Sequence, residues 1–189
     1  MKRASVILIV AITFLSSGFS DKGIWIIDAD SQLSIHGSTN VSTFTCKIDC
    51  YRGSDTLHFV TNYAACELQF SRNRMTIPIR NFDCGSRQIS KDFWKTLKSE
   101  TYPQLDINFR SLQNLTVKNN SWINGVVDIS LAGVTSRYTI RYRVTLDKNT
   151  ILLKGTHPVN FSDFNLQAPE KLQGLIKVDE VLNVNLTWY

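Results

Sequence analysis

The chain has 189 residues, 43% of them hydrophobic and 20% charged, with a formal net charge of +5. This length suits one domain around a single core, and no linker rich in Pro, Gly or Ser divides it. The basic residues are scattered among acidic ones, which argues against the clustered basic face of a nucleic-acid-binding protein.

Residues 1–20 have the pattern of an export signal. Lys2 and Arg3 precede an uncharged apolar stretch over 4–15, and small residues are frequent in 16–20. The apolar stretch is shorter than the roughly 20 residues of a membrane-spanning helix, so we expect cleavage near residue 20. The mature domain, residues 21–189, would have a net charge of +3 because Lys2 and Arg3 are lost. We expect it in the periplasm or secreted.

Alternating apolar and polar side chains predict short strands through the first part of this domain. Such alternation places one row of side chains in the core and the other in solvent. Two short strands are expected within 21–37, broken at 28–31. The next are expected within 41–50, 57–70 and 75–80, and Pro78 places the last of these at an edge or beside a bulge.

Residues 90–98 do not continue this alternation and instead predict one short helix. Phe93, Trp94 and Leu97 share one side at helical spacing, and Ser90 is available as the N-cap. The helix should end before Pro103. We expect it to cap an open end of the sheet, either as a movable lid or as a fixed plug.

The second half returns to alternation. Strands are predicted over 105–110 and 182–188, and a hairpin over 126–144 with residues 133–136 between its two runs. The total is about eight or nine strands with no alternation of strands and helices. An antiparallel barrel or a sandwich follows.

All four cysteines lie in the exported part, where an oxidising compartment favours disulfides. Cys46 and Cys50 would be about 13 Å apart in an extended strand, beyond the roughly 7 Å that a disulfide tolerates. Of the three connectivities we favour Cys46–Cys84 with Cys50–Cys66. A zinc site is the competing interpretation, but no Cys-x-x-Cys pair supports it, and we predict no metal.

No motif indicates catalysis. His36, His58 and His157 lie in separate segments, and the sequence has neither a Gly-x-Ser-x-Gly elbow nor a phosphate-binding glycine loop. Asp163 beside Ser162 suits a turn or a cap better than a catalytic pair. We therefore predict no catalytic residues and a protein that is not an enzyme.

Several segments, in order, resemble the YceI-like family of exported, lipocalin-like polyisoprenoid-binding proteins. They are Trp25-Ile26-Ile27-Asp28, Ser31-Gln32-Leu33-Ser34-Ile35, the 90–98 helix leading into Tyr102-Pro103, Phe109-Arg110-Ser111, Gly133-Val134-Thr135 after the strand from Gly125, and Phe161-Ser162-Asp163-Phe164 before Gly174-Leu175-Ile176-Lys177-Val178. Phe44-Thr45-Cys46 and Phe82-Asp83-Cys84-Gly85 are similar to a cysteine-bearing branch of that family.

The resemblance implies an all-β, antiparallel, lipocalin-like β-barrel with a helix near one end. Its interior would hold a long isoprenoid tail, such as that of a quinone or a polyprenyl lipid, with no other cofactor. Contact with a membrane surface would be transient, and the oligomeric state stays open, a homodimer included. The alternative is an exported β-domain with a filled core that acts as an envelope interaction or adhesion module.

The side chains that face the interior of the predicted barrel are the expected ligand contacts. The candidate lining residues are Trp25, Ile27, Leu33, Ile35, Phe93, Trp94, Leu97, Ile107, Phe109, Ile129, Leu131, Tyr138, Ile140, Tyr142 and Val184. The competing interpretation is a solid core made by the same residues. Tyr138 and Tyr142 are the most suggestive, because a buried phenol needs a hydrogen-bond partner that a ligand head group or water could supply.

Overall fold

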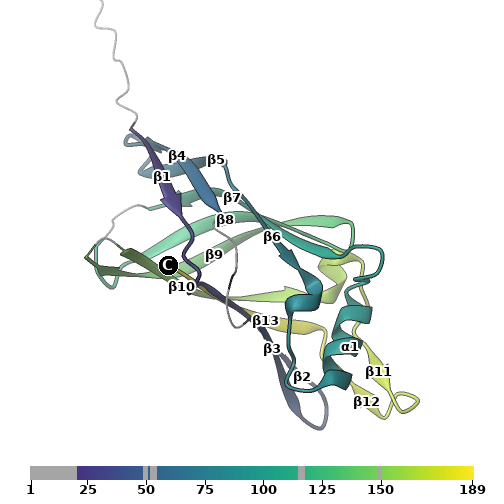
Figure 1. The fold of residues 1–189 in the computed structure, drawn as a ribbon. Coiled ribbons are helices and arrows are strands. Elements are labelled where there is room, and N and C mark those ends of the chain that lie inside the picture. The colour runs from purple at the N-terminus through teal and green to yellow at the C-terminus, as the bar shows by residue number, and fades with distance from the viewer. Residues whose placement is uncertain (1–20, 49–50, 52–54, 115–117, 149) are drawn as a thin grey trace, which may run out of the picture.

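The computed structural model describes residues 21–48, 51, 55–114, 118–148 and 150–189, so the predicted export segment lies outside the described residues. The fold is a curled antiparallel sheet with one helix at its end (Figure 1). The strands are β1 Lys22–Ile26, β2 Gln32–Ser38, β3 Thr43–Ile48, β4 Thr56–Asn62, β5 Glu67–Arg72, β6 Arg74–Pro78, β7 Gln104–Gln113, β8 Trp122–Leu131, β9 Val134–Asp147, β10 Thr150–Asn160, β11 Glu170–Lys171, β12 Ile176–Lys177 and β13 Val181–Trp188. The helices are η1 Ile79–Asn81, α1 Arg87–Thr96 and η2 Phe161–Phe164.

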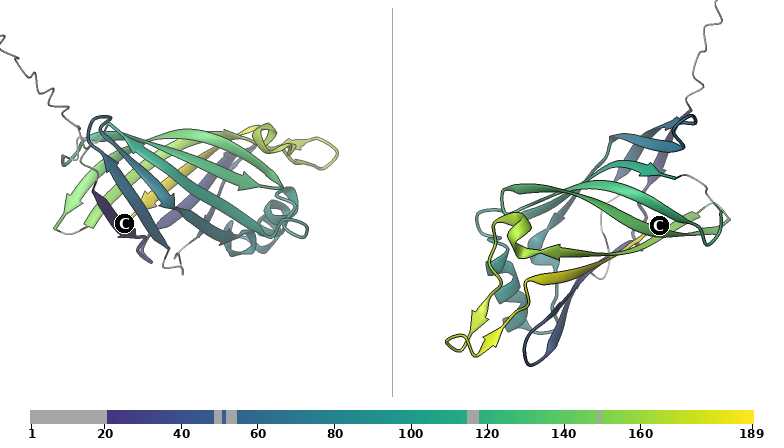
Figure 2. Two further views of the ribbon diagram at one scale, coloured as in Figure 1. Left: turned by 90° about the horizontal axis from the view of Figure 1, so that it is seen from above. Right: turned by 180° about the vertical axis from the view of Figure 1, so that it is seen from behind.

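The main sheet runs in the order β1-β4-β5-β7-β8-β9-β10-β13-β2-β3, and β6 pairs with β7 beside β5. The long strands β7 to β10 form its curved back, and Figure 2 shows the sheet wrapping into a half-barrel. Apolar residues alternate along these strands and point into the curl, where they form one continuous core. The predicted all-β, antiparallel, barrel-like fold with a single short α-helix is confirmed.

The sheet closes on itself at the end that carries α1. The backbone of Lys47 in β3 exchanges two hydrogen bonds with Asp83, which follows β6, at N···O distances of 2.8 and 3.0 Å. The adjacent residues, Cys46 and Cys84, form a disulfide. Strand β3 is therefore tied to the chain that leaves β6 by this isolated bridge and by the disulfide.

The sheet has more strands than the eight or so predicted. The described residues form an 11-stranded sheet and a separate two-stranded one. The run 57–70, predicted as one strand, folds back as β4 and β5 with a turn between them. The segment 150–160 was not predicted as a strand, because Gly155, His157 and Pro158 interrupt its alternation, yet it forms β10 between β9 and β13.

The hairpin of β8 and β9 is tighter than predicted. Leu131 pairs with Val134, so the turn is Ala132-Gly133 and not residues 133–136. Both turn residues have positive φ, 51° and 82°, as a two-residue turn between twisted strands needs. The predicted helix also begins earlier. Ser86 is its N-cap and accepts a hydrogen bond from the Ile89 N–H, whereas Ser90 lies inside the first turns.

Among the described residues, no helix is long and apolar enough to span a membrane.

A carboxylate buried on the outer face joins three of the back strands. Asp128 of β8 accepts hydrogen bonds from Arg110 of β7, at 2.7 Å, and from Arg137 of β9, at 2.6 and 3.0 Å. Its side chain is 7% exposed, while both arginines are more than half exposed. Chiefly because of the hydrogen bond from Arg137, the pKa of Asp128 falls from 3.8 to about 2, although burial opposes the shift.

We expect Asp128→Asn to reduce stability at neutral pH by about 1–2 kcal/mol, a modest loss because water screens the exposed arginines. The pKa is lower in the folded chain, so the carboxylate stabilises the fold above about pH 4 and this contribution disappears as pH falls toward 2. Urea unfolding across pH measures the effect. The wild-type and variant curves should converge near pH 2, and a gap that stayed constant with pH would contradict this assignment.

Candidate binding cavity

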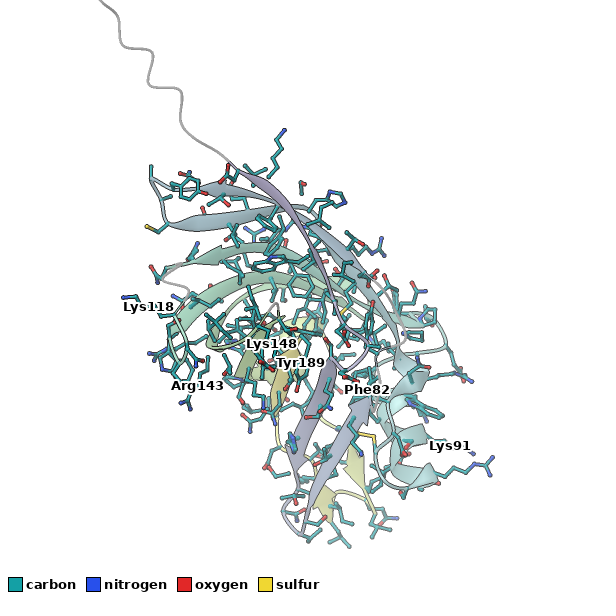
Figure 3. The ribbon with its side chains drawn as sticks, turned by 60° about the vertical axis from the view of Figure 1, so that its left-hand side comes forward. Phe82, Lys91, Lys118, Arg143, Lys148 and Tyr189 are labelled. Carbon is teal, nitrogen blue, oxygen red and sulfur yellow. A yellow bond between two sulfur atoms is a disulfide. The ribbon has the colours of Figure 1, made fainter. Side chains whose placement is uncertain are left out.

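A cavity of about 360 Å³ lies inside the curl, at the end away from α1. It is lined by Ile24, Trp25, Ile26, Ile27, Asp28, Leu57, Phe70, Phe109, Ser111, Leu112, Gly125, Val127, Tyr142, Thr150, Ile151, Leu153, Trp188 and Tyr189. Ile24 and Ile26 are more than half exposed, which places the mouth beside β1. Figure 3 shows Tyr189 toward Lys148, while Lys91 of α1 lies at the other end of the molecule. This volume is within the range of small-molecule sites.

Four aromatic side chains form a row along one wall. Trp25 lies 5.9 Å from Phe70, Phe70 lies 6.3 Å from Phe109, and Phe109 lies 5.7 Å from Trp188, measured between ring centroids. All three pairs meet edge to face, the arrangement that the ring quadrupoles favour. The row brings together β1, β5, β7 and β13, and it gives the cavity a rigid apolar side.

Two glycines leave the space that the ring of Tyr142 occupies at the opposite wall. A Cβ added at Gly125 of β8 would lie 2.6 Å from the Tyr142 ring, and one added at Gly155 of β10 would lie 2.8 Å from it. Real side chains do not approach so closely, so both neighbouring strands must carry glycine for the ring to lie flat between them. The ring position is therefore fixed by the sequence of three strands.

Two polar atoms beside the lining, the Tyr142 hydroxyl oxygen and the Trp188 indole nitrogen, are fully buried, and neither has a hydrogen bond of normal geometry among the described residues. Burial raises the pKa of Tyr142 above its ordinary value, and the nearby Trp188 N–H opposes part of that rise. Both atoms are enclosed by protein and do not face the open volume of the cavity.

The other end of the interior is filled. Only about 60 Å³ remains beneath α1. The side chains around it are Leu33, Ile35, Phe82, Phe93, Leu97, Leu105, Ile107, Ile129, Leu131, Val159, Asn160, Phe161, Phe164, Leu166, Leu182, Val184 and Leu186. The sequence could not distinguish a hollow barrel from a solid one, and the structure contains both, one at each end.

The predicted lining residues divide between these two ends. Trp25, Ile27, Phe109 and Tyr142 line the large cavity. Leu33, Ile35, Phe93, Leu97, Ile107, Ile129, Leu131 and Val184 surround the small one. Trp94, Tyr138 and Ile140 line neither. The prediction missed Phe70, Ile151, Leu153 and Trp188. Trp188 follows the alternation of Leu182, Val184 and Leu186 and could have been added on that signal.

The hydroxyl of Tyr138 is satisfied by the protein. It donates to Asp163 at 2.9 Å, and burial, together with this hydrogen bond, raises the pKa of Tyr138. Asp163 also accepts from the Asn160 backbone N–H at 3.1 Å and so caps η2, the role predicted for it. The ring of His157 packs 5.2 Å from that of Tyr138. In the described part of the chain, no three His, Cys, Asp or Glu side chains gather as a metal site would need.

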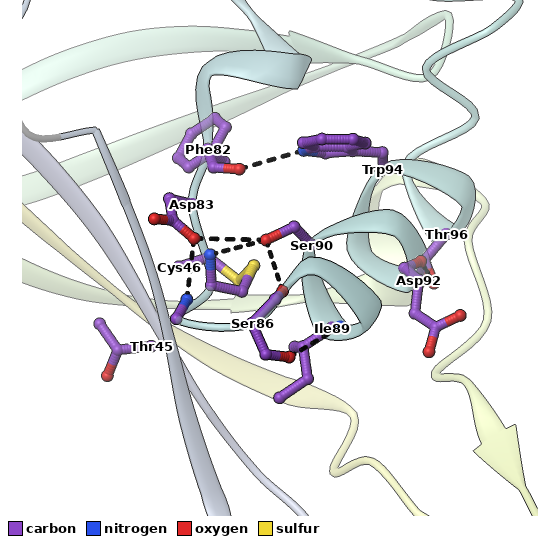
Figure 4. Close-up of a disulfide and its surroundings, with 12 residues drawn as sticks. Thr45, Cys46, Phe82, Asp83, Ser86, Ile89, Ser90, Asp92, Trp94 and Thr96 are labelled. Atoms are coloured by element: carbon purple, nitrogen blue, oxygen red, sulfur yellow. Dashed lines mark hydrogen bonds between the residues drawn. A yellow bond between two sulfur atoms is a disulfide. The ribbon is translucent and has the colours of Figure 1, made fainter.

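The helix α1 is fastened at its start to the segment that follows β6 (Figure 4). The Ser90 hydroxyl accepts from the Cys84 backbone N–H at 3.0 Å and donates to the Ser86 carbonyl at 2.9 Å. The Trp94 indole donates to the Phe82 carbonyl at 3.1 Å, and Phe93 packs on the Phe82 ring. These contacts favour the fixed plug over the movable lid.

The Cys46–Cys84 disulfide, the first bridge of the favoured pairing, is present and lies next to this helix start (Figure 4). The second predicted pair is not seen. Cys66 is an exposed free thiol in the turn between β4 and β5, and its expected partner Cys50 lies outside the described residues. The structure therefore shows one of the two predicted bridges, and that one secures the filled end.

We expect Trp94→Ala to leave the rates of ligand exchange unchanged, because Trp94 touches neither cavity and the large cavity opens beside β1. Its stability should fall by about 1–2 kcal/mol through lost packing and the lost hydrogen bond to Phe82. Stopped-flow exchange of a fluorescent isoprenoid measures the first effect and urea unfolding the second. Faster exchange in a folded variant would show that the helix is a gate.

Comparison with known proteins gives a consistent result. A family model described as YceI-like domain matches residues 56–188. BcnA of Burkholderia cenocepacia is 18% identical, with a TM-score of 0.59 over 86% of this chain and 98% of that one. A polyisoprenoid binding domain from Saccharophagus degradans, implicated in plant cell wall breakdown, is 13% identical, with a TM-score of 0.57 over 86% and 95%.

A third similar structure is the YCEI protein of Campylobacter jejuni, at 12% identity and a TM-score of 0.51, with 99% of this chain and 96% of that chain covered. At these identities the likeness to the three structures is one of fold. The comparison with curated proteins found no match.

Proposed function

Because the chain belongs to the YceI-like domain family, we propose that it binds a long-chain isoprenoid or another amphiphilic lipid inside the curled sheet, and that it carries or stores this lipid in the cell envelope. The observation that supports the proposal most directly is the 360 Å³ cavity with its aromatic wall. The Saccharophagus degradans domain of similar fold is described as polyisoprenoid binding. The proposed role is binding without catalysis, and contact with the membrane is brief.

The energetics favour a reversible carrier. Each five-carbon isoprene unit removed from water gains about 4 kcal/mol, at about 0.8 kcal/mol per buried carbon, so a few units offset the entropy lost on binding. A bilayer is as apolar as the cavity, so moving the same tail from membrane to protein is nearly neutral. A protein of this kind can both load and release its lipid, as exchange between two membranes requires.

The test is to purify the protein from its own host, extract it with organic solvent and analyse the extract by mass spectrometry. We expect a lipid built from isoprene units, such as a polyprenyl alcohol or a quinone. The same protein should protect an added isoprenoid from extraction by vesicles. Repeated absence of bound lipid, together with no protection, would favour the alternative role of an envelope interaction or adhesion module.

A further inference from the structure

We propose that the outer surface beside the mouth of the large cavity docks on a membrane and recognises anionic phospholipid. This surface lies where β8 and β10 begin and β9 ends, and its exposed basic residues are Lys118, Arg141, Arg143, Lys148 and Lys154. We call these five residues the basic patch. The inference rests on the proposed function, because a lipid carrier must meet the bilayer at the opening through which its lipid passes.

The basic patch lies at the same end of the half-barrel as the mouth. Ile151 of β10 lines the cavity and pairs with Leu146 at the end of β9, so the two side chains share the inner face of the sheet. Leu146 is 37% exposed, which shows that the inward-facing row continues to the surface here. Figure 3 shows Arg143 and Lys148 on the same side of the molecule as Tyr189, another lining residue. A membrane docked on the patch would therefore reach the opening.

The fold gathers in this patch the positive charge that is scattered along the sequence. Residues 118–124 and 141–154 contain the five basic residues and one acid, Asp147, so they carry a net charge of 5 − 1 = +4. The whole domain 21–189 carries only +3, which leaves 3 − 4 = −1 for all its other residues. The patch is therefore the part of the domain that a negatively charged surface attracts.

The charges of the basic patch are not neutralised by the protein. Among the described residues, no carboxylate forms an ion pair with any of the five. The basic residues that do form ion pairs lie elsewhere, and they are Arg74, Arg110, Arg137, Lys171 and Lys177. An external anion can therefore bind to the patch without first displacing a carboxylate of the protein.

Two of these charges are directly opposite each other. Arg143 of β9 pairs with Lys154 of β10, and both side chains are exposed. Like charges opposite each other in neighbouring strands destabilise a sheet. Arg143 donates to the side-chain oxygen of Asn120 at 3.1 Å, a neutral partner that leaves the positive charge in place. A lipid phosphate near both side chains would relieve this repulsion.

Exposed apolar side chains accompany the basic patch. Trp122 is 51% exposed, and the guanidinium of Arg141 lies 4.6 Å from the centroid of its ring. Leu146, Ile24 and Ile26 are exposed at the mouth itself. Tryptophan and aliphatic side chains beside Lys or Arg are typical of proteins that lie in the interface of a bilayer. A nucleic acid would meet the cations and leave these apolar groups in water, so the combination favours a membrane.

A second exposed apolar surface, the tip of the β11–β12 hairpin, fits this role less well. Leu172 and Leu175 are 67% and 73% exposed. The two lysines nearest to them in sequence, Lys171 and Lys177, each form an ion pair with a carboxylate, at 2.8 and 3.4 Å. The hairpin lies beside α1 at the filled end (Figure 1), so a membrane bound there would not meet the cavity. This tip therefore provides a control surface.

Binding to vesicles tests the proposal. Wild-type protein is mixed with vesicles of phosphatidylcholine alone or of phosphatidylcholine with an equal part of phosphatidylglycerol, and the bound fraction is measured by sedimentation. We expect binding to the anionic vesicles that weakens at high salt, because salt screens exposed charges, and little binding to the neutral vesicles. Each basic residue close to an anionic surface should strengthen binding about fivefold.

Charge removal at the two ends of the molecule is compared next. Arg143→Gln with Lys154→Gln removes two charges of the patch and should weaken binding to anionic vesicles roughly 30-fold. The melting temperature should not fall, because the like-charge contact is removed as well. Lys91→Gln with Lys95→Gln removes two charges from α1 at the other end and is the matched control. Its vesicle binding should stay within about twofold of the wild type, because these charges lie beyond the screening length from the docked surface.

The apolar contribution has its own pair of variants. Trp122→Ala should weaken binding to anionic vesicles roughly 10-fold, because a large apolar ring no longer enters the interface. Leu172→Ser with Leu175→Ser alters the control surface and should leave binding unchanged. Both sites are exposed, so the variants should fold like the wild type.

The outcomes separate this inference from the proposed function. Farnesol added from solution is titrated by tryptophan fluorescence, since Trp25 and Trp188 line the cavity, and the patch variants should bind it like the wild type. Failure of the wild type to bind farnesol would contradict the proposed function. Binding of farnesol with no preference for anionic vesicles would overturn the docking surface alone.

Three further results would also overturn it. The first is an equal loss of vesicle binding in the α1 variant and the patch variant. The second is a loss confined to the variant at the hairpin tip. The third is binding of a single-stranded oligonucleotide as tight as that of anionic vesicles together with no effect of Trp122→Ala, which would make the patch a site for soluble polyanions.

Discussion

Removal of the disulfide by Cys46→Ala with Cys84→Ala is expected to lower the free energy of unfolding by about 4 kcal/mol. The bridge joins residues 38 apart in sequence, and the chain-entropy model gives about this value for a loop of that length. Both cysteines are buried, so alanine is the suitable replacement, because serine would add two buried hydroxyls. The loss should appear in urea unfolding of the oxidised wild-type protein against the double variant.

Loss of the disulfide should lower stability strongly and leave ligand binding unchanged. The bridge ties β3 to the segment before α1, at the filled end, while the large cavity lies at the other end. Ligand affinity of the folded double variant should therefore stay close to that of the wild type. Cys66→Ala serves as the control, since this thiol is exposed and free, and its stability should be unchanged. A loss below about 1 kcal/mol in the double variant would contradict the chain-entropy account.

The fold was predictable wherever a strand alternates cleanly. Residues 105–110, 126–131 and 138–144 were assigned from period-2 patterns and lie in β7, β8 and β9. Strand β10 was not predicted, because packing against the neighbouring strands requires residues that interrupt its alternation of apolar and polar side chains. Gly155 is required by the Tyr142 ring across the strand pair, and this requirement comes from the sheet and cannot be read from the segment itself.

The site was predictable only in part, and for a related reason. Alternation identifies the side chains that face inward, and Trp25, Phe109 and Tyr142 were found in this way. It does not show whether they meet a partner or an empty space. Tyr138 and Tyr142 lie on the same face of β9 and were indistinguishable in sequence. The first hydroxyl donates to Asp163, whereas the second lies near the Trp188 indole N–H without a hydrogen bond of normal geometry among the described residues. Only the packing of distant segments separates the two.

The variant Phe109→Ala is expected to lose about 3–5 kcal/mol of stability, the usual cost of truncating a buried phenylalanine. Phe109 is the middle of the aromatic row, in contact with Phe70 on one side and Trp188 on the other, so both edge-to-face pairs disappear. The cavity widens at the same place. Farnesol should therefore bind roughly 10-fold more weakly, because the loss of about 1.4 kcal/mol of ring contact corresponds to that factor.

Phe44→Ala is the matched control for this prediction. Phe44 packs over Gly37, at the β2–β3 pairing, and its half-buried ring lines neither cavity. Truncation there should cost less stability than at Phe109 and leave farnesol affinity unchanged. Urea unfolding and fluorescence titration of the two variants measure both quantities. If the two substitutions weakened farnesol equally, the ligand would not be bound along the aromatic row, because only Phe109 belongs to the wall that it is proposed to touch.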